Sequence, residues 1–386
     1  MDQPIGYYHF EGNIYIHFLT LLSPEKWSIG KNVLLVPSKN KTMKYEAVTI
    51  KDIAKELGLS TSTVSRALRD SYEISPETKK MVLEYAEKIN YRPNPIALSL
   101  KEKRTRSIGI VVAEIANSFF SQVINGIESI ANDKGYNVII TQSHESFERE
   151  LSNVQYLASR SIDGLLISPS SETEDMSHLK HLHDRGFPIV FFDRIVDEID
   201  THKVIVDSKK GGYDATHHLI EGGYKQIATL ANVEYLSITR DRVSGYQAAL
   251  EDHKIKFDPS LVKYCLHGGL VYEEVEIALD ALFKQKNKPD AIFAAADKLT
   301  TNCLRYFKAK KIRVPEDIAI IGFSNIDLTE LLSPSLSVVR QPAFEMGQVA
   351  TELLLNLIES KRPVKDFETK MLQPELFIRE STTRKK

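Results

Sequence analysis

The sequence of 386 residues predicts an α-helical helix-turn-helix domain joined to an α/β domain of two lobes, each built on a doubly wound parallel sheet. Two observations carry this prediction. Residues 49–69 read TIKDIAKELGLSTSTVSRALR, which has the spacing of two short helices around a tight turn. After residue 106, apolar runs alternate with amphipathic segments, as they do in parallel sheets covered by helices on both faces.

The first predicted helix has a defined start and a defined end. Thr49 and Asp52 have the spacing of a capping box, and Gly58 tolerates the positive φ that often follows the last helical turn. Ser60 is placed to cap the second helix. The apolar residues recur at helical intervals and comprise Ile50, Ile53, Ala54 and Leu57, with Leu59 expected in the core.

The second predicted helix buries Val64, Ala67 and Leu68 and keeps its other positions polar. A small residue at Ala54, a flexible turn and a branched residue at Val64 meet the steric needs of a helix-turn-helix. A helical hairpin of this spacing also occurs inside enzymes, so the pattern alone leaves both classes open. The polar positions that would face DNA are Thr61, Ser62, Thr63, Ser65 and Arg66.

A third helix follows, with Ser75 as the cap, Pro76 at its first position and Glu77 in its first turn. The predicted buried stripe of this helix comprises Met81, Val82, Tyr85, Ala86 and Ile89. Three helices of this size bury little surface by themselves, so we expect a minimal domain.

The segment after the third helix is strongly basic. Residues 92–106 hold five Lys or Arg and one acid, whereas the net charge of the whole chain is only −2. Clustered cations supply nonspecific affinity for DNA phosphates, although a solvated linker would also be charged. The apolar residues Ile96, Ala97, Leu98 and Leu100 favour a helix that forms on binding and inserts into the minor groove.

The runs TIKDIAKELGLSTSTVSRALR, SPET, YRPNPIALSLK and RSIGIVV resemble the lactose-repressor (LacI/GalR) family of bacterial transcription regulators from about Met43 to the end. The resemblance implies that Thr61, Ser62 and Arg66 reach base edges and that Thr63 and Ser65 lie nearer the backbone. It also implies that Leu100 intercalates in the minor groove, with Lys101 beside it for phosphate or groove contact. An arginine binds guanine O6 and N7 with two hydrogen bonds, so Arg66 is the sharpest candidate.

The resemblance divides the chain into a DNA-binding domain at 43–91, a hinge helix and linker at 92–106, and an effector-binding and dimerisation domain at 107–382. The last is expected to have the fold of periplasmic binding proteins. Its predicted strands lie at 108–114, 137–143, 164–170, 188–193, 204–207, 226–232, 290–297 and 318–325, with helices such as 273–285 and 299–310 between them. A ligand cleft is expected where strand carboxyl ends face each other.

Polar residues stand at the ends of these strands, at Asp193, Asp207, Asp297, Ser324 and Asn325. A carboxylate there can accept two sugar hydroxyls, and aromatic faces stack on a pyranose ring. Each such residue could equally be a strand-end cap or an interlobe contact. With the resemblance, the candidate effector-binding residues are Phe119, Phe120, Ser170, Asp193, Arg242, Asp297, Ser324 and Gln341.

Two departures from the family pattern bear on the effector. Ser324 stands where relatives with sugar or purine effectors commonly carry Asp, and Leu236 stands at or near an Arg position of the purine-responsive branch. The second departure argues against a purine, so we expect a sugar or sugar derivative. Arg194 directly follows Asp193 and could pair with it or meet an acidic sugar.

Enzymatic signatures are absent from the sequence. It lacks the phosphate-cradling patterns G-x-G-x-x-G and G-x-x-x-x-G-K-[ST], and it lacks the nucleophile elbow G-x-S-x-G. The histidines at 178, 181, 183, 217 and 218 lack the partners of a metal site and are expected on helix surfaces. We therefore predict no catalytic residues, no metal and no cofactor. Cys265, in a predicted strand, and Cys303, in the core, suit a reducing compartment without disulfides.

The expected protein is a cytoplasmic, nucleoid-associated homodimer that binds a palindromic operator and a small-molecule effector, with no membrane partner. The alternative is a periplasmic-type sugar-binding protein. Such a protein would carry an export signal and would lack a helix-turn-helix. A sugar kinase or dehydrogenase would need the missing glycine motifs. Residues 1–42 fit neither domain, and we expect a disordered arm or sequence upstream of a natural start at Met43.

Overall fold

The computed structural model describes residues 9–10, 13–14, 48–91 and 104–384. The chain divides after Arg92 into two compact units, residues 1–92 and 93–386. In the first unit, β1 (His9–Phe10) and β2 (Asn13–Ile14) pair antiparallel. The expectations for residues 1–42 otherwise lie outside the described residues.

The helix-turn-helix begins and ends where the sequence predicts, with α1 (Ile50–Glu56), α2 (Thr61–Ala67) and α3 (Pro76–Lys88). The Asp52 carboxylate accepts from the Thr49 N–H at 2.8 Å, which closes the start of α1. Gly58 has a φ of +64°, and the Ser60 hydroxyl accepts from the Thr63 N–H at 3.0 Å. Local hydrogen bonds therefore fix the turn.

The core of this unit is small. Its buried side chains are Ile53, Ala54, Val64, Ala67, Val82 and Ala86, and Leu59 packs against them partly buried. The prediction that Met81 is buried is wrong, because its side chain is 44% exposed. Met81 lies one position before Val82, about 100° around the helix, and so falls outside the face that meets α1 and α2.

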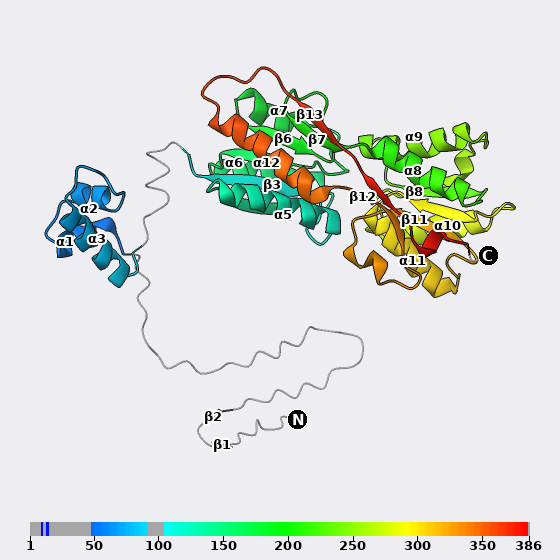
Figure 1. Ribbon diagram of the computed structural model, residues 1–386, viewed down its shortest axis with the longest axis horizontal. Coiled ribbons are helices and arrows are strands. Elements are labelled where there is room, and N and C mark those ends of the chain that lie inside the picture. Colours follow the sequence, from blue (N-terminus) through cyan, green and yellow to red (C-terminus); the bar gives the residue numbers. More distant parts are fainter. Residues whose placement is uncertain (1–8, 11–12, 15–47, 92–103, 385–386) are drawn as a thin grey trace, which may run out of the picture. The chain divides into compact units, whose positions relative to one another are not determined.

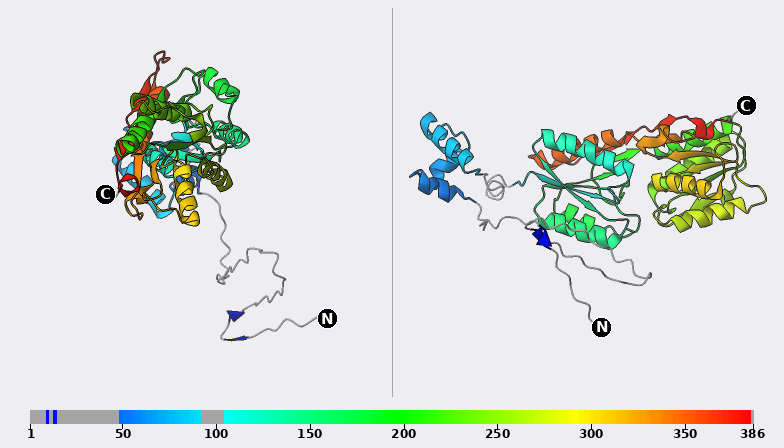
Figure 2. Two further views of the ribbon diagram at one scale, coloured as in Figure 1. Left: turned by 90° about the vertical axis from the view of Figure 1, so that its right-hand side faces the viewer. Right: turned by 90° about the horizontal axis from the view of Figure 1, so that it is seen from below.

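The second unit has two lobes, each with a central sheet between helical layers (Figures 1 and 2). The first sheet is parallel throughout, in the order β13-β7-β6-β5-β3-β4. Its strands are β3 (Ser107–Val112), β4 (Asn137–Gln142), β5 (Gly164–Ile167), β6 (Ile189–Phe192), β7 (Lys203–Val206) and β13 (Thr369–Leu372). One face is covered by α5 (Ser118–Asp133) and α12 (Ala343–Glu359), the other by α6 (Phe147–Ser159) and α7 (Ser177–Asp184).

The second sheet has the order β14-β12-β11-β10-β8-β9 and is parallel except where β14 meets β12. Its strands are β8 (Ile227–Ala231), β9 (Val262–Tyr264), β10 (Ala291–Ala294), β11 (Ala319–Phe323), β12 (Ser337–Arg340) and β14 (Glu375–Phe377). One face is covered by α8 (Ser208–Glu221) and α9 (Ser237–Asp252), the other by α10 (Tyr272–Phe283) and α11 (Asp297–Lys310). Short 3-10 turns lie at Pro259–Leu261, Asp327–Glu330 and Glu380–Thr382.

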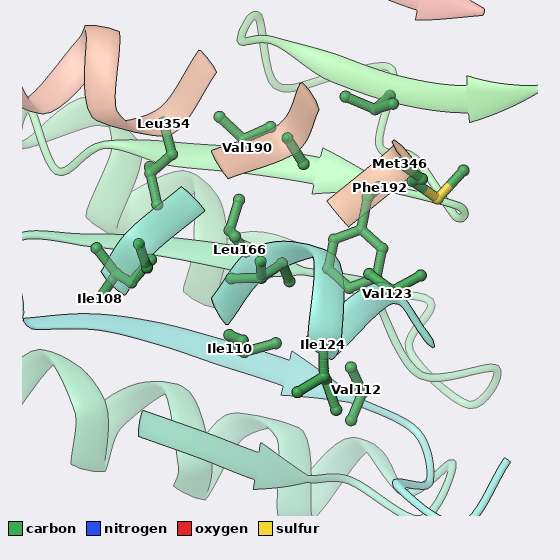
Figure 3. Packing of buried hydrophobic residues seen from close by; sticks show 14 of the residues in the cluster. Ile108, Ile110, Val112, Val123, Ile124, Leu166, Val190, Phe192, Met346 and Leu354 are labelled. Carbon is green, nitrogen blue, oxygen red and sulfur yellow. The ribbon is translucent and has the colours of Figure 1, made fainter. Parts of the chain in front are cut away.

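Strand periodicity decides which face each side chain occupies. In β3, Ile108, Ile110 and Val112 point to α5 and α12, whereas Val111 packs on the opposite side (Figure 3). Both faces are apolar, which explains the near-continuous Val, Ile and Leu runs in the sequence. The chain crosses between the lobes three times, before α8, before α12 and between β13 and β14.

Candidate functional site

The polar face of α2 is the candidate DNA-reading surface. Thr61 and Ser62 are exposed at the start of the helix, and the Arg66 side chain is 58% exposed one turn later. Val64 and Ala67 lie in the core and hold this face outward. The Nη1 atom of Arg66 lies 3.0 Å from Glu73 Oε2, in an ion pair with the segment before α3.

Thr63 and Ser65 are engaged within the unit. The Thr63 hydroxyl lies 2.9 Å from that of Ser60, so it supports the helix cap. The Ser65 hydroxyl accepts a hydrogen bond from the Arg69 guanidinium. The hinge residues predicted to enter the minor groove, Leu100 and Lys101, lie outside the described residues.

A cleft opens between the two lobes of the second unit, at the carboxyl ends of the strands. It is lined by backbone or side-chain atoms of six predicted effector residues, which are Phe119, Phe120, Asp193, Arg242, Asp297 and Gln341. Phe119 and Phe120 come from the first turn of α5, and their rings meet edge to face at 5.2 Å between centroids. The structure thus brings residues from both lobes to one surface.

Arg242 is buried in the wall of the cleft. Its Nη1 donates to the Ala295 carbonyl at 2.8 Å and its Nη2 donates to Gln341 Oε1 at 3.2 Å. The guanidinium carbon lies 3.8 Å from the centre of the Phe323 ring, a close cation–π contact. Burial lowers the pKa of Arg242 to about 10.

Asp193 is buried at the end of β6 and has a φ of +61°. Burial raises the pKa of its carboxyl above the ordinary value, against the opposing charges of Arg194 and Arg242. Arg194 does not form its ion pair with Asp193, since both of its terminal nitrogens donate to the Glu145 carboxylate, at 2.6 and 2.8 Å. The left-handed backbone at Asp193 is the kind of local strain found at functional sites.

Asp297 is held by the loop that follows β11. Its carboxylate accepts from the Ser324 hydroxyl and from the Asn325 N–H at 2.8 Å. Burial raises the pKa of Asp297, and these hydrogen bonds oppose that rise. Ser324 is fully buried and is not among the residues that line the cleft, and its hydroxyl donates to Asp297.

Ser170, the other predicted effector residue, is not among the lining residues either. It is buried behind the cleft, where its N–H donates to Glu150 Oε2 at 2.5 Å. Sequence reasoning missed six polar residues of the wall, which are Glu114, Asn117, Glu145, Asn232, His267 and Lys298. Asn232 could have been predicted, because it is a polar residue that directly follows the last residue of β8, as Asp193 follows β6. Glu145 follows His144 in a loop where both residues have positive φ, and nothing local predicts that.

The helix-turn-helix and the two-lobed α/β unit define a class of DNA-binding transcription regulators that carry a small-molecule-binding fold. The lacI family of bacterial regulatory proteins matches residues 49–94, and the periplasmic binding protein-like domain matches residues 216–382. The PurR transcriptional repressor of Vibrio atlanticus (strain LGP32) is 34% identical over 313 residues, which cover 81% of this chain and 92% of that protein. This chain therefore belongs to the lacI family, which consists of regulators rather than enzymes.

Solved structures agree with this fold. The complex of the transcriptional regulator CelR with cellobiose is 29% identical, with a TM-score of 0.64, and the match covers 86% of this chain and 99% of CelR. The Lac repressor bound to ONPG in the repressed state is 24% identical, with a TM-score of 0.74, and covers 87% of this chain and 100% of that one. The predicted fold class is thereby confirmed. None of the described helices is both long and apolar enough to cross a membrane.

Proposed function

We propose that this protein is a transcriptional repressor that binds a palindromic operator as a homodimer and is controlled by an effector in the interlobe cleft. The proposal rests on one observation: the same chain has a helix, α2, with an exposed polar face, and a cleft lined by buried charged groups. One helix-turn-helix reads only a half-site, and a two-fold protein matches a palindrome.

At the operator, α2 enters the major groove with Thr61, Ser62 and Arg66 toward base edges. The exposed Arg66–Glu73 ion pair is worth at most about 1 kcal/mol, so guanine competes readily for the guanidinium. Thr63 and Ser65 lie nearer the DNA backbone, and both hydroxyls already bond within the unit, that of Thr63 to Ser60 at the start of α2 and that of Ser65 to Arg69 just past its end.

The cleft controls DNA binding through lobe closure. Several side-chain contacts cross between the lobes at its edges. Gln122 donates to the Asn325 carbonyl at 3.1 Å, Lys298 Nζ lies 3.1 Å from Glu114 Oε2, and the Tyr235 hydroxyl donates to the Ser171 carbonyl. An effector that strengthens or breaks this closed form changes the spacing of the hinge segments at 93–101. The coupling is reciprocal, so operator DNA shifts effector affinity by the same factor.

We infer that the effector is a small polyhydroxylated molecule, a sugar or sugar derivative. Three buried polar atoms of the wall have no hydrogen-bond partner among the described residues, namely Asn232 Oδ1, Arg194 Nε and Arg242 Nε. A buried polar group without a partner costs about 1–3 kcal/mol. A hydroxyl both donates and accepts, and can therefore satisfy the amide oxygen as well as a guanidinium N–H. The cellobiose complex of the similar CelR supports this inference.

A purine is the second candidate. The relatives named PurR favour it, and the arginines and the Asn232 amide could bond ring nitrogens and exocyclic groups. Leu236, which stands at or near the position where the family resemblance expects an Arg in the purine-responsive branch, caps α9 and does not line the cleft. The chain therefore lacks one cation that a purine oxo or carboxylate group would use.

Two experiments test the proposal. Gel shift and footprinting on the DNA upstream of the chain's own gene should show protection of a palindrome that Arg66→Ala weakens, and the proposal fails if no palindrome is protected. A thermal-shift panel of sugars and purine bases, followed by titration calorimetry, identifies the effector. Stabilisation by hypoxanthine or guanine, with none by sugars, would replace the sugar assignment with the purine one.

A further inference from the structure

We propose that the second lobe binds a divalent transition metal ion, with Zn²⁺ as its representative, through His217, Glu221 and His253. These residues lie at the carboxyl-terminal ends of α8 and α9 and do not line the effector cleft. The prediction that the helical histidines lack partners is wrong for His217, because His253, from the end of another helix, lies against it. It is also wrong for His178, which is bonded to Glu150 and nearly buried.

The donor atoms are already gathered. One donor atom from each of the three residues lies within 4.8 Å of the others, and His217 Nδ1 is 2.8 Å from His253 Nε2. His217 and Glu221 are four positions apart and therefore share one face of α8. Two imidazoles and one carboxylate with a fourth position open to water form a common zinc ligand set. Among the described residues, no other three His, Cys, Asp or Glu side chains bring donors this close.

The imidazole pair needs little movement to accept a metal. At the Zn–N distance of about 2.0–2.1 Å, tetrahedral geometry sets the two nitrogens about 3.4 Å apart. The two rings now share a proton at 2.8 Å, so an opening of about 0.6 Å admits the ion in its place. His217 and His253 are half-buried and Glu221 is exposed, which leaves the site open to solvent.

The electrostatic setting favours a cation. Both α8 and α9 end here, and each carboxyl-terminal end of a helix carries about half a negative charge. Asp252 adds a full charge beside His253 and accepts from the Tyr213 hydroxyl at 2.9 Å. The Tyr213 ring stacks on His217 at 5.7 Å between centroids with the planes 12° apart, which orients the imidazole.

The frame that carries the ligands is rigid. A Cβ on Gly245 would lie 2.0 Å from the Lys209 carbonyl oxygen, and one on Gly212 would lie 2.2 Å from that of Arg242, so α8 and α9 pack backbone to backbone. A metal ion bound to both helices would therefore stabilise a pair that already exists. Because ligands that bind only the native state add stability by mass action, Zn²⁺ should raise the melting temperature.

The test uses the untagged, full-length protein freed of metal. Titration calorimetry with ZnCl2 should show one strong site per chain, and Co²⁺ substitution should give the visible absorption of a low-symmetry nitrogen and oxygen site. His253→Gln and Glu221→Gln should each weaken Zn²⁺ binding at least about tenfold and abolish the Zn²⁺-dependent rise in melting temperature. His181→Gln, an exposed histidine of α7, is the matched control and should bind as the wild type does.

Two outcomes would overturn the proposal. One is the absence of a Zn²⁺-dependent shift in the wild-type protein. The other is equal binding by His253→Gln, Glu221→Gln and the wild type, which would show that the metal is held elsewhere. Glu221 is exposed and its replacement leaves the core intact, so this variant keeps the test valid even if a histidine variant folds poorly.

Discussion

The proposed DNA-reading face of α2 and the proposed effector cleft between the lobes differ in burial. Thr61, Ser62 and Arg66 are exposed above a small core, whereas Arg242 and Asp193 are buried in the wall of the cleft. The exposed polar side chains of α2 stay hydrated in the free protein and would lose their bound water only on binding DNA. Groups in the cleft have lost it on folding, as the lowered pKa of Arg242 and the raised pKa of Asp193 show.

This difference implies that the two surfaces respond differently to mutation. A substitution on α2 should change DNA binding and leave the stability of the protein nearly unchanged. A substitution in the cleft should change effector binding and stability together, because it alters charges that are desolvated in the free protein. Four changes test this contrast.

Arg242→Ala is expected to have the largest effect. It removes two hydrogen bonds and the cation that faces Asp193 and Asp297, so effector affinity should fall by about 2–5 kcal/mol, and the melting temperature should fall as well. Calorimetry with the identified effector measures the first effect, and thermal unfolding measures the second. Arg240→Ala removes an exposed arginine of the same helix and is the control. Wild-type affinity in Arg242→Ala would exclude the cleft as the effector site.

Asp193→Asn separates binding from stability. Because the pKa of Asp193 is raised on folding, its contribution to stability is fully present below its ordinary pKa and is lost as pH rises through the folded value. The ionised side chain thus disfavours folding at neutral pH, and Asn, which suits a φ of +61°, should raise the melting temperature there. Effector affinity should fall by about 1.5–3 kcal/mol, the value of a hydrogen bond to a charge.

The control for this change is Asp197→Asn, which alters an exposed carboxylate in the following loop. The gain in stability of Asp193→Asn should shrink as the pH is lowered toward the ordinary pKa of aspartate, near 4. A gain that persists unchanged at low pH would mean that the raised pKa is not its cause.

Arg66→Ala should act on DNA alone. Loss of a bidentate contact to guanine costs about 1–3 kcal/mol at one position of the operator, while the free energy of unfolding should change by less than about 0.5 kcal/mol. Glu73→Gln frees the guanidinium and should preserve or strengthen operator binding. Footprinting and chemical denaturation of the same samples measure both quantities. A large loss of stability in Arg66→Ala would contradict the expectation that substitutions on the exposed face of α2 leave the stability nearly unchanged.

The sequence predicted what depends on near neighbours. The caps at Thr49, Ser60 and Ser75 and the positive φ at Gly58 follow from residues a few positions away, and the structure confirms them. The strand segments were also predicted, because both faces of each sheet are buried and the apolar runs are unbroken.

Prediction failed where a side chain's surroundings come from distant segments. Ser324 stands at a strand end as Asp193 does, but it turns inward to bond Asp297. Arg194 pairs with Glu145, a residue 49 positions earlier in a loop of unusual backbone. His217 meets His253 only because α8 and α9 pack in contact. The position of a polar residue at the end of a strand therefore predicts that it lies near the cleft, but it does not predict whether its side chain lines the cleft.

Tyr235→Phe should give the smallest effect and tests whether closure itself contributes to binding. The Tyr235 side chain is outside the cleft wall, and its hydroxyl reaches across to the Ser171 carbonyl of the other lobe. Loss of this bond should destabilise the closed form by about 0.5–1.5 kcal/mol. Effector affinity then falls by at most about tenfold, because less of the protein is in the binding-competent form.

The matched control is Tyr264→Phe, which removes the hydroxyl of another exposed tyrosine of the second lobe. Small-angle scattering of the free protein should show a larger radius for Tyr235→Phe, and saturating effector should restore the wild-type value. Equal affinities for Tyr235→Phe and the wild type would mean that the cleft binds its effector without lobe closure. Effector binding in the cleft would then have to control DNA binding by α2 through a change other than lobe closure.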